Sequence, residues 1–150
     1  MKKYWIDILM VAVLVACGGQ APALYATTLD VTMTYTYSST TSIDSGNNYP
    51  ACTGSVTVNC VTGFNIYDTT KSTPVLLGKV PNPSPASGTT SASATLTLTN
   101  PTPGSHTAVA RTAYIGGGGT AAESVDSAPA TFQIQAIAPV APASLTITVQ

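Results

Sequence analysis

Alternation of polar and apolar residues is the feature that most constrains how this chain can fold. From Leu29 to Tyr37 the sequence LDVTMTYTY places Leu, Val, Met and Tyr at every second position, and residues 92–99 place Ala and Leu in the same way. Because side chains of a β-strand point alternately to its two faces, each stretch predicts a strand with one buried face. Further strands are expected at residues 61–68, 75–80, 106–115, 131–137 and 144–149. About seven strands separated by turn-forming residues predict an all-β antiparallel sandwich.

The low charge of the chain excludes one class of function. Only 7% of the residues are charged, and Lys+Arg 5 against Asp+Glu 6 gives a net charge of -1. Average globular domains carry about 25% charged residues. Nucleic-acid binding requires a basic surface that neutralises phosphates, so we expect no nucleic-acid partner. The hydrophobic fraction of 44% is still enough for a core, and 150 residues give room for one domain.

Residues 1–16 have the form of a secretory signal peptide. Lys2 and Lys3 precede an apolar run from Ile8 to Ala16. A basic start followed by a short apolar core is typical of export signals, and this core is too short to span a bilayer. We therefore expect residues 1–16 to be removed and the rest of the chain to be exported.

Residues 14–17, LVAC, resemble the lipobox of bacterial lipoproteins, in which the cysteine is lipidated and becomes the new N-terminus. This resemblance implies lipidation of Cys17, and Gly18 after it implies sorting to the bacterial outer membrane and cell surface. Contact with the membrane is then expected only through the lipid anchor. Ordinary cleavage after Ala23 or Ala26 is the alternative, and it predicts a periplasmic or secreted protein.

Cys52 and Cys60 are the cysteines left in the exported chain, because Cys17 is either lipidated or removed. In an oxidising compartment two cysteines this close in sequence most simply form a disulfide, which stabilises by roughly 2–3 kcal/mol for so short a loop. A metal site is the alternative, but zinc takes three or four ligands and His106 is the only histidine. We therefore expect a disulfide, no metal site and no cofactor.

Three stretches resemble the fibronectin type III domain and related bacterial Ig-like domains. VTGFNIYD at residues 61–68 is similar to the family's third strand, and LTNPTPGSHTAVARTAY at residues 98–114 is similar to its Pro-Gly corner and the long strand that follows. ESVDSAPATFQI at residues 123–134 looks like its last strand. The resemblance implies an Ig-like, Greek-key β-sandwich of about seven strands. Such domains are typically extracellular spacers, adhesive modules or binding modules, and not catalysts.

The resemblance divides the chain into four parts. These are a signal peptide at residues 1–16, a short tether at 17–27, a fibronectin type III-like sandwich at 28–137, and a Pro/Ala hinge with a terminal strand at 138–150.

The chain also departs from the family pattern. The tryptophan of the family's second strand is absent, and we expect Tyr35 to fill its space. His106 or Thr107 stands nearest to the family's corner tyrosine, and the loop before the third strand is long and carries the cysteine pair. Residues 24–28 are too few for a first strand, whereas residues 139–149 look like one at the other end of the chain.

The terminal strand has no assigned neighbour in this scheme. It alternates through Ser144, Leu145, Thr146, Ile147, Thr148 and Val149. This segment either folds back as the last strand of its own sandwich, adds to the sheet of a neighbouring copy, or remains from a tandem array. The edge beside Leu29–Tyr37 is where its partner is first to be sought.

The chain offers few residues for catalysis. A G-x-S-x-G motif is absent, and His106 lies in an expected strand with no serine or aspartate partner indicated by the pattern. The carboxylates beyond the signal are scattered, at Asp30, Asp44, Asp68, Glu123 and Asp126. We therefore expect no catalytic residue and no enzymatic activity.

Three further features have both a functional and a plain structural interpretation. Asp44–Asn48 contains oxygen ligands suited to calcium but lacks the acidic spacing of a calcium loop, so we expect a turn. Gly116–Gly119 lacks the Lys and the helix of a phosphate-binding loop, so we expect a flexible hairpin tip. Tyr37, Tyr49 and Tyr67 either form a recognition patch or pack in the core and its rim, and packing is the commoner fate.

Together these features predict a non-enzymatic exported module with a structural, adhesive or binding role, tethered as a surface lipoprotein. Its partner is expected to be a protein, a cell surface or another copy of itself. The alternative is a subunit of an extracellular filament or assembly joined by addition of the C-terminal strand. A carbohydrate-binding accessory module is a third hypothesis, and it requires aromatic side chains aligned on one exposed face.

Overall fold

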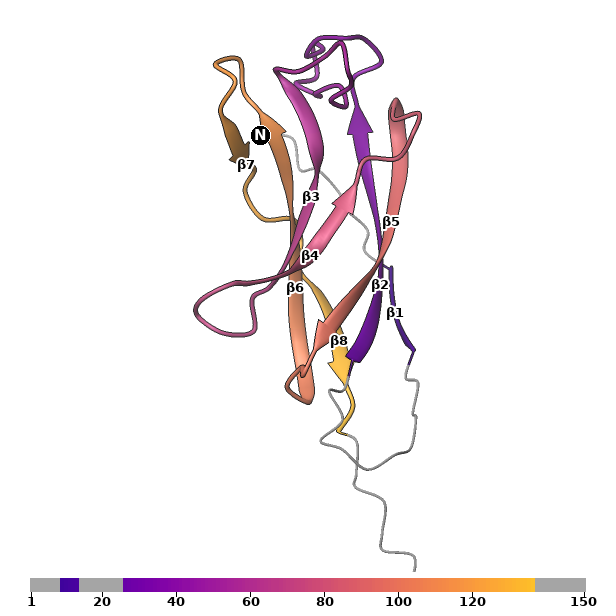
Figure 1. The fold of residues 1–150 in the computed structure, drawn as a ribbon, viewed down its shortest axis with the longest axis vertical. Coiled ribbons are helices and arrows are strands. Elements are labelled where there is room, and N and C mark those ends of the chain that lie inside the picture. The colour runs from indigo at the N-terminus through magenta and orange to yellow at the C-terminus, as the bar shows by residue number, and fades with distance from the viewer. Residues whose placement is uncertain (1–8, 14–25, 137–150) are drawn as a thin grey trace, which may run out of the picture.

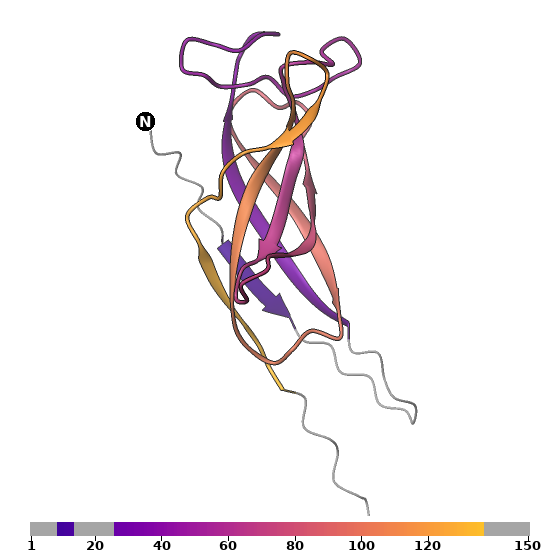
Figure 2. The same cartoon turned by 90° about the vertical axis from the view of Figure 1, so that its left-hand side faces the viewer.

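Antiparallel pairing joins the strands of the computed structural model, which describes residues 9–13 and 26–136, into two β-sheets (Figure 1). The strands are β1 Leu9–Val13, β2 Ala26–Tyr37, β3 Cys60–Asp68, β4 Val75–Pro81, β5 Gly88–Thr99, β6 Gly104–Ile115, β7 Ala121–Glu123 and β8 Ala130–Ile134. One sheet has the order β1-β2-β5, and the other has the order β4-β3-β6-β7, with β8 also paired to β6. The sheets pack face to face (Figure 2). The predicted all-β, sandwich-like fold of antiparallel sheets is confirmed.

The last strand of the sandwich is split into β7 and β8. β7 pairs with Ala113–Ile115 and β8 pairs with Gly104–Ala108, both along the edge of β6 that faces away from β3. Between the two, the backbone amides of Ser124 and Ser127 still donate to carbonyls of β6. Counted as one split strand, β7 and β8 bring the described strands to seven. This number includes β1, which lies in the predicted signal peptide, whereas the predicted strand at residues 144–149 lies outside the described residues.

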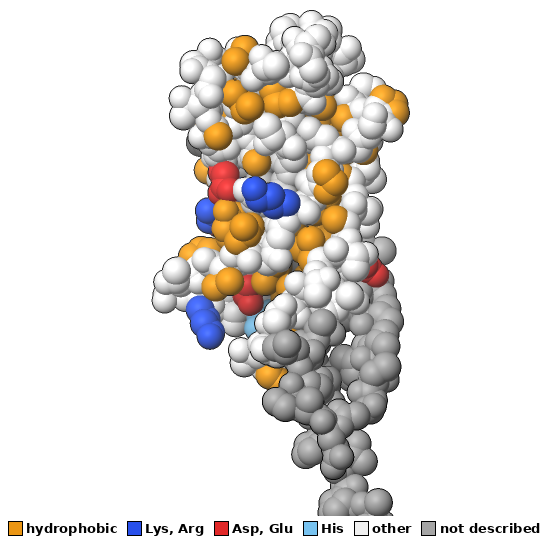
Figure 3. All heavy atoms as spheres, in the orientation of Figure 1, with side chains coloured by type: hydrophobic (Ala, Val, Ile, Leu, Met, Phe, Trp, Pro, Cys, Tyr) orange, Lys and Arg blue, Asp and Glu red, His pale blue; other side chains and the backbone are white. Residues whose placement is uncertain are grey.

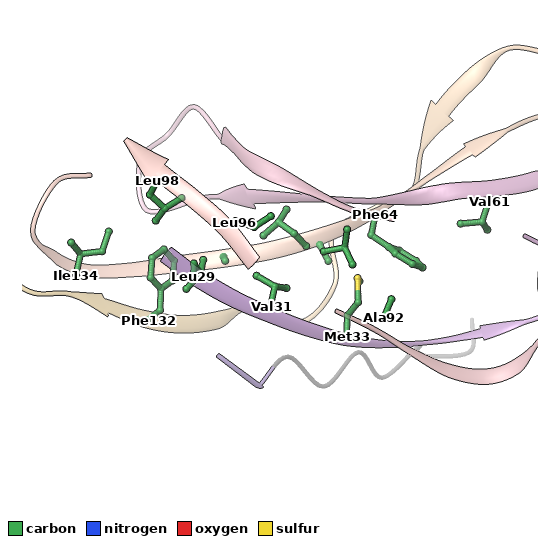
Figure 4. Close-up of a cluster of buried hydrophobic side chains, with 14 of the residues drawn as sticks. Leu29, Val31, Met33, Val61, Phe64, Ala92, Leu96, Leu98, Phe132 and Ile134 are labelled. Atoms are coloured by element: carbon green, nitrogen blue, oxygen red, sulfur yellow. The ribbon is translucent and has the colours of Figure 1, made fainter. Parts of the chain in front are cut away.

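The core lies between the two sheets and is built from the apolar positions of the alternating strands (Figure 4). The smaller sheet contributes Leu29, Val31, Met33, Ala92, Leu96 and Leu98, and the larger sheet contributes Phe64, Ile66, Ala108, Ala110, Phe132 and Ile134. Burial of each large apolar side chain contributes about 1.5–3 kcal/mol to folding. The alternation that defines the strands therefore also provides the main force that holds the sheets together.

Tyr35, Tyr37 and Phe64 form an aromatic cluster within this core. The ring centroids of the two tyrosines lie 4.9 Å apart, and those of Tyr35 and Phe64 lie 5.3 Å apart. Tyr37 is fully buried, and its hydroxyl donates to Oδ1 of Asn82 at 2.8 Å. Burial raises the pKa of the Tyr37 phenol far above its usual value. Both tyrosines of this strand therefore pack against the Phe64 ring.

The outer face of the β2–β5 pair carries polar side chains that bond across the strands. The oxygen pairs are Thr32 with Ser93 at 2.9 Å, Thr34 with Ser91 at 3.4 Å, Thr36 with Thr89 at 3.0 Å, and Thr95 with Asp30 at 2.6 Å. Cross-strand pairs of this kind contribute roughly 0.2–1 kcal/mol each. The polar positions of the alternating pattern therefore fix the pairing of these strands while the apolar positions fill the core.

Candidate functional site

The edge of β2 that faces away from β5 is paired with β1. Leu9 to Val13 run antiparallel to β2, opposite Thr32 to Thr28 (Figure 1). β1 lies within the predicted signal peptide, so the strand beside β2 is one that export is expected to remove. In the chain with its N-terminal segment attached, β1 is the neighbour of β2 on this side.

The β2 edge lacks the features that usually block further strand pairing. Edge strands are commonly protected by lysines, prolines or bulges. In β2, Asp30 is the only charged residue and proline is absent. The ladder between β2 and β5 runs from Ala26↔Thr99 to Tyr37↔Gly88 without a register shift. β2 is therefore a long, regular strand whose outer edge is suited to accept another strand.

The other sheet edges in the described part of the chain carry such protection. β4 contains Lys79 and ends at Pro81, and a register shift interrupts its pairing with β3. The edge formed by β7 and β8 is broken by the irregular segment that contains Asp126 and Pro129. β5 has no charged residue, but β4 of the other sheet packs against it. Among these edges, that of β2 is the best candidate for an interaction site.

His106 and Asp68 meet where the β3–β6 pair ends. Nδ1 of His106 lies 2.6 Å from Oδ2 of Asp68, and Nε2 lies 2.7 Å from the carbonyl oxygen of Thr102. Both neighbours of the ring are hydrogen-bond acceptors, so each ring nitrogen faces an acceptor of the protein. The ring also stacks on Phe132, with centroids 5.2 Å apart. Sequence reasoning assigned His106 no aspartate partner, and Asp68 is the partner that it missed.

The charge of Asp68 is stabilised by several donors. Burial raises the pKa of its carboxyl group, but hydrogen bonds from Thr70 and the His106 ring outweigh burial and hold the pKa below its usual range. A cavity of about 340 Å³ adjoins the pair and is also lined by Leu76, Leu98 and Phe132. Both ring nitrogens of His106 are already bonded within the protein, so the ring offers no lone pair to a molecule in this cavity.

A second polar cluster lies on the outer face of the larger sheet. The guanidinium of Arg111 lies over the Tyr67 ring, 4.5 Å from its centroid, and its Nε lies 2.6 Å from Oδ1 of Asp126. Glu123 accepts a hydrogen bond from the Tyr67 hydroxyl at 2.8 Å and another from the side chain of Asn65. The hydrogen bond to Glu123 raises the pKa of Tyr67. These contacts tie the β7 segment to the sheet and use the charged groups for structure.

The disulfide and both predicted turns are present. Cys52 and Cys60 are joined with their Cα atoms 4.9 Å apart. Oδ1 of Asp44 accepts from the backbone amides of Gly46 and Asn48, and hydrogen bonds from Asn48 and Gly46 lower the pKa of Asp44. Gly116–Gly119 forms a turn closed by a backbone hydrogen bond of 2.9 Å. The disulfide indicates an oxidising, extracytoplasmic compartment.

The three tyrosines of the predicted recognition patch lie in different places. Tyr37 is buried in the core, and Tyr67 belongs to the Arg111 cluster. The ring of Tyr49 packs on that of Tyr114, with centroids 5.5 Å apart. The structure does not bring them together into one patch, and packing is the role that it gives them.

Two predicted sites, Cys17 and the segment Ser144–Val149, lie outside the described residues. Within residues 9–13 and 26–136, no group of three or more His, Cys, Asp or Glu side chains is placed to hold a metal ion. In the same part of the chain, no helix is long and apolar enough to cross a membrane.

Charged side chains are few on the face shown in Figure 3.

Comparison of the chain with protein-family models, with curated proteins and with solved structures gave no match.

Proposed function

We propose that this chain is a non-enzymatic exported module with a structural, adhesive or binding role, built on an Ig-like sandwich similar to fibronectin type III domains. The strand order supports the Ig-like assignment. β2 and β5 pair in one sheet while β3 and β6 pair in the other, as strands B and E and strands C and F do in Ig-like sandwiches. β4 beside β3 and the split β7–β8 strand beside β6 extend the same arrangement.

The bonding of the polar side chains is the observation that carries this proposal. His106, the only histidine, has both ring nitrogens bonded, and Glu123 and Asp126 are bonded to Arg111. Within the described residues, no buried side-chain nitrogen or oxygen lacks a hydrogen-bond partner. Catalytic groups need a free proton site or lone pair directed at a substrate. The polar groups found here instead hold strands and turns together.

The N-terminal segment and the disulfide support an exported location. We propose that residues 1–16 are removed and that Cys17 is lipidated, which tethers the sandwich to the outer membrane through the residues between Cys17 and β2. The disulfide between Cys52 and Cys60 supports the exported location.

Mass spectrometry of the chain expressed with its own N-terminus in a bacterium tests this proposal. A lipidated Cys17 is the expected result, and Cys17→Ala is expected to abolish the lipid mass. An unmodified N-terminus after Ala23 or Ala26 would replace the lipoprotein with a periplasmic or secreted protein. A chain that keeps residues 1–16 would contradict export by either route.

A second candidate, a subunit of an extracellular assembly joined by strand addition, is favoured by the unprotected edge of β2. The separate positions of Tyr37, Tyr49 and Tyr67 give no corresponding support to a carbohydrate-binding module.

A further inference from the structure

From the β2 edge and the sequence pattern, we infer that the segment Ser144–Val149 of a second copy of this chain pairs with β2 in the place held by β1. The inference rests on the proposed export of the chain, because removal of residues 1–16 takes β1 away and leaves the outer edge of β2 open. Backbone groups of an open edge pair readily with another strand. The antiparallel pairing of β1 shows that this edge accepts a strand along Thr28–Thr32.

The residues of β2 define which strand fits this edge best. Leu29, Val31 and Met33 are at most 1% exposed and face the core, whereas Thr28, Asp30 and Thr32 belong to the outer face. Residues directly opposite each other in an antiparallel pair share a face. A well-matched neighbour therefore alternates between apolar residues opposite the first set and polar residues opposite the second.

The sequence of β1 does not alternate in this way. It reads LMVAV, and its register places Leu9, Val11 and Val13 opposite Thr32, Asp30 and Thr28. The register thus sets apolar residues of β1 against polar positions of β2. This mismatch fits a segment selected as the apolar core of an export signal rather than as a strand of the mature sandwich.

The segment Ser144–Val149 has the alternation that the edge requires. In one antiparallel register, Thr148 stands opposite Asp30. The apolar residues then also match: Ile147 stands opposite Val31, and Leu145 stands opposite Met33. A shift by two residues places Thr146 opposite Asp30 and keeps the alternation. In both registers apolar residues extend the core and threonines extend the polar outer face.

The direction of the pairing favours a second copy over the same chain. Ile134 at the end of β8 pairs with Gly104, which begins β6. Ala26 at the start of β2 pairs with Thr99, which ends β5. The end of β8 and the start of β2 therefore lie at the same end of the sandwich, beside the turn between β5 and β6 (Figure 1). A segment antiparallel to β2 must instead enter beside Met33 and run toward that end. From the same chain it would first have to travel up the sheet and then reverse.

The connecting residues 135–143 make this reversal difficult. The rise from Ala26 to Thr34 along β2 is about 26 Å at roughly 3.3 Å per residue. From Ile134 to Ser144 the extended chain spans at most about 33–36 Å. In the first register this leaves about 7–10 Å, no more than the roughly 10 Å between packed sheets, for the crossing and the reversal. Pro139 and Pro142 also stiffen this connection. From a neighbouring copy the same residues act as a linker, and the segment enters the edge in the required direction.

Cysteine crosslinking between two differently tagged copies tests the inference. One full-length chain carries Asp30→Cys and the other carries Thr146→Cys or Thr148→Cys, and the pair is co-expressed, exported and oxidised mildly. Thr97→Cys is the matched control acceptor, because Thr97 is exposed on the outer face of the same sheet but lies on β5. Intact mass of each sample gives the N-terminus at the same time.

The expected result is a covalent heterodimer with Asp30→Cys that exceeds the Thr97→Cys control by at least about tenfold, because pairing raises the local concentration of the two thiols. Equal yields at both acceptors would overturn the inference. So would a crosslink that forms only within one chain carrying both Asp30→Cys and Thr148→Cys, since the segment then pairs with its own sheet. If the mass shows that residues 1–16 are retained, the proposed export fails as well, whereas a cleaved chain without the heterodimer leaves export intact.

A second measurement uses single apolar-to-acidic changes. Ile147→Asp places a charge where the inferred strand meets the core and is expected to leave the exported protein monomeric in sedimentation experiments. Val125→Asp is the control, because Val125 is 89% exposed and lies in the segment between β7 and β8. Loss of assembly with both variants, or with neither, would contradict pairing through Ser144–Val149.

Discussion

His106 lies with its Nδ1 atom 2.6 Å from a carboxylate oxygen of Asp68, although the two residues are far apart in the sequence. The contact joins the end of β3 to the start of β6, and the second ring nitrogen of His106 reaches the carbonyl of Thr102 in the turn before β6. One side chain thus connects a strand end, a turn and the stacked ring of Phe132. The pair stabilises the end of the sandwich at which β8 finishes.

Acid is expected to weaken this end of the sandwich through Asp68. The pKa of Asp68 is lower in the folded chain than its usual value, so as the pH falls the unfolded chain takes up this proton first. The stabilisation is complete above the ordinary aspartate pKa of about 3.9 and is lost as the pH falls through the folded value. Asp68→Asn is expected to reduce the acid dependence and to cost about 1.5–3 kcal/mol at neutral pH, the value of hydrogen bonds to a charged group.

Urea unfolding of the wild type and of Asp68→Asn, from neutral pH down to about pH 3, measures both effects. Equal stability of the two proteins at neutral pH, or acid slopes that coincide, would show that the carboxylate of Asp68 does not stabilise the folded chain.

Removal of the disulfide is expected to destabilise the sandwich without changing its fold. Cys52 and Cys60 enclose a short loop, and in the chain-entropy account its closure is worth about 2–3 kcal/mol. The double variant Cys52→Ala with Cys60→Ala should therefore unfold at a lower urea concentration than the oxidised wild type. A reducing agent should shift the wild type and leave the double variant unchanged, and a reductant effect on the variant would point to another cause.

The alternating pattern was sufficient to predict two long strands and the part of the core that they supply. Residues 29–37 and 92–99 alternate strictly, and the structure buries their apolar positions, including Leu29 and Met33, at the interface between the sheets. The disulfide was predictable because two cysteines close in sequence in an exported chain have few other partners. Each of these predictions depends on local sequence alone.

Contacts between distant strands were not predictable in this way. The pairing of His106 with Asp68 and of Glu123 with Tyr67 depends on the registers of β3 with β6 and of β6 with β7. Register is fixed jointly by the core and by turn geometry, which no single stretch contains. One signal was available: once residues 61–68 and 106–115 are paired as neighbouring antiparallel strands, Asp68 at the end of the first comes close to His106 at the start of the second.

Gly63 is expected to tolerate no side chain. It lies at the register shift between β3 and β6 with a φ of 150°, and an added Cβ would lie 2.8 Å from the carbonyl oxygen of Val80. Gly63→Ala is therefore expected to cost more than about 1 kcal/mol, because both the backbone conformation and the close approach oppose it. Gly118→Ala is the control, since no atom lies within 4 Å of its added Cβ. Similar unfolding midpoints for the two variants would contradict the role of Gly63.

Glu123 is expected to control the ionisation of Tyr67. The hydrogen bond from the Tyr67 hydroxyl to the Glu123 carboxylate favours the neutral phenol and raises the pKa of Tyr67. Glu123→Gln removes the negative charge but keeps an acceptor, so the pKa of Tyr67 should fall toward its usual value of about 10. NMR titration of the tyrosine rings measures this change. Tyr37 serves as the internal control, because burial is the main cause of its raised pKa and the variant should leave it unchanged. If both tyrosines shift together, the substitution has altered the fold rather than this one contact.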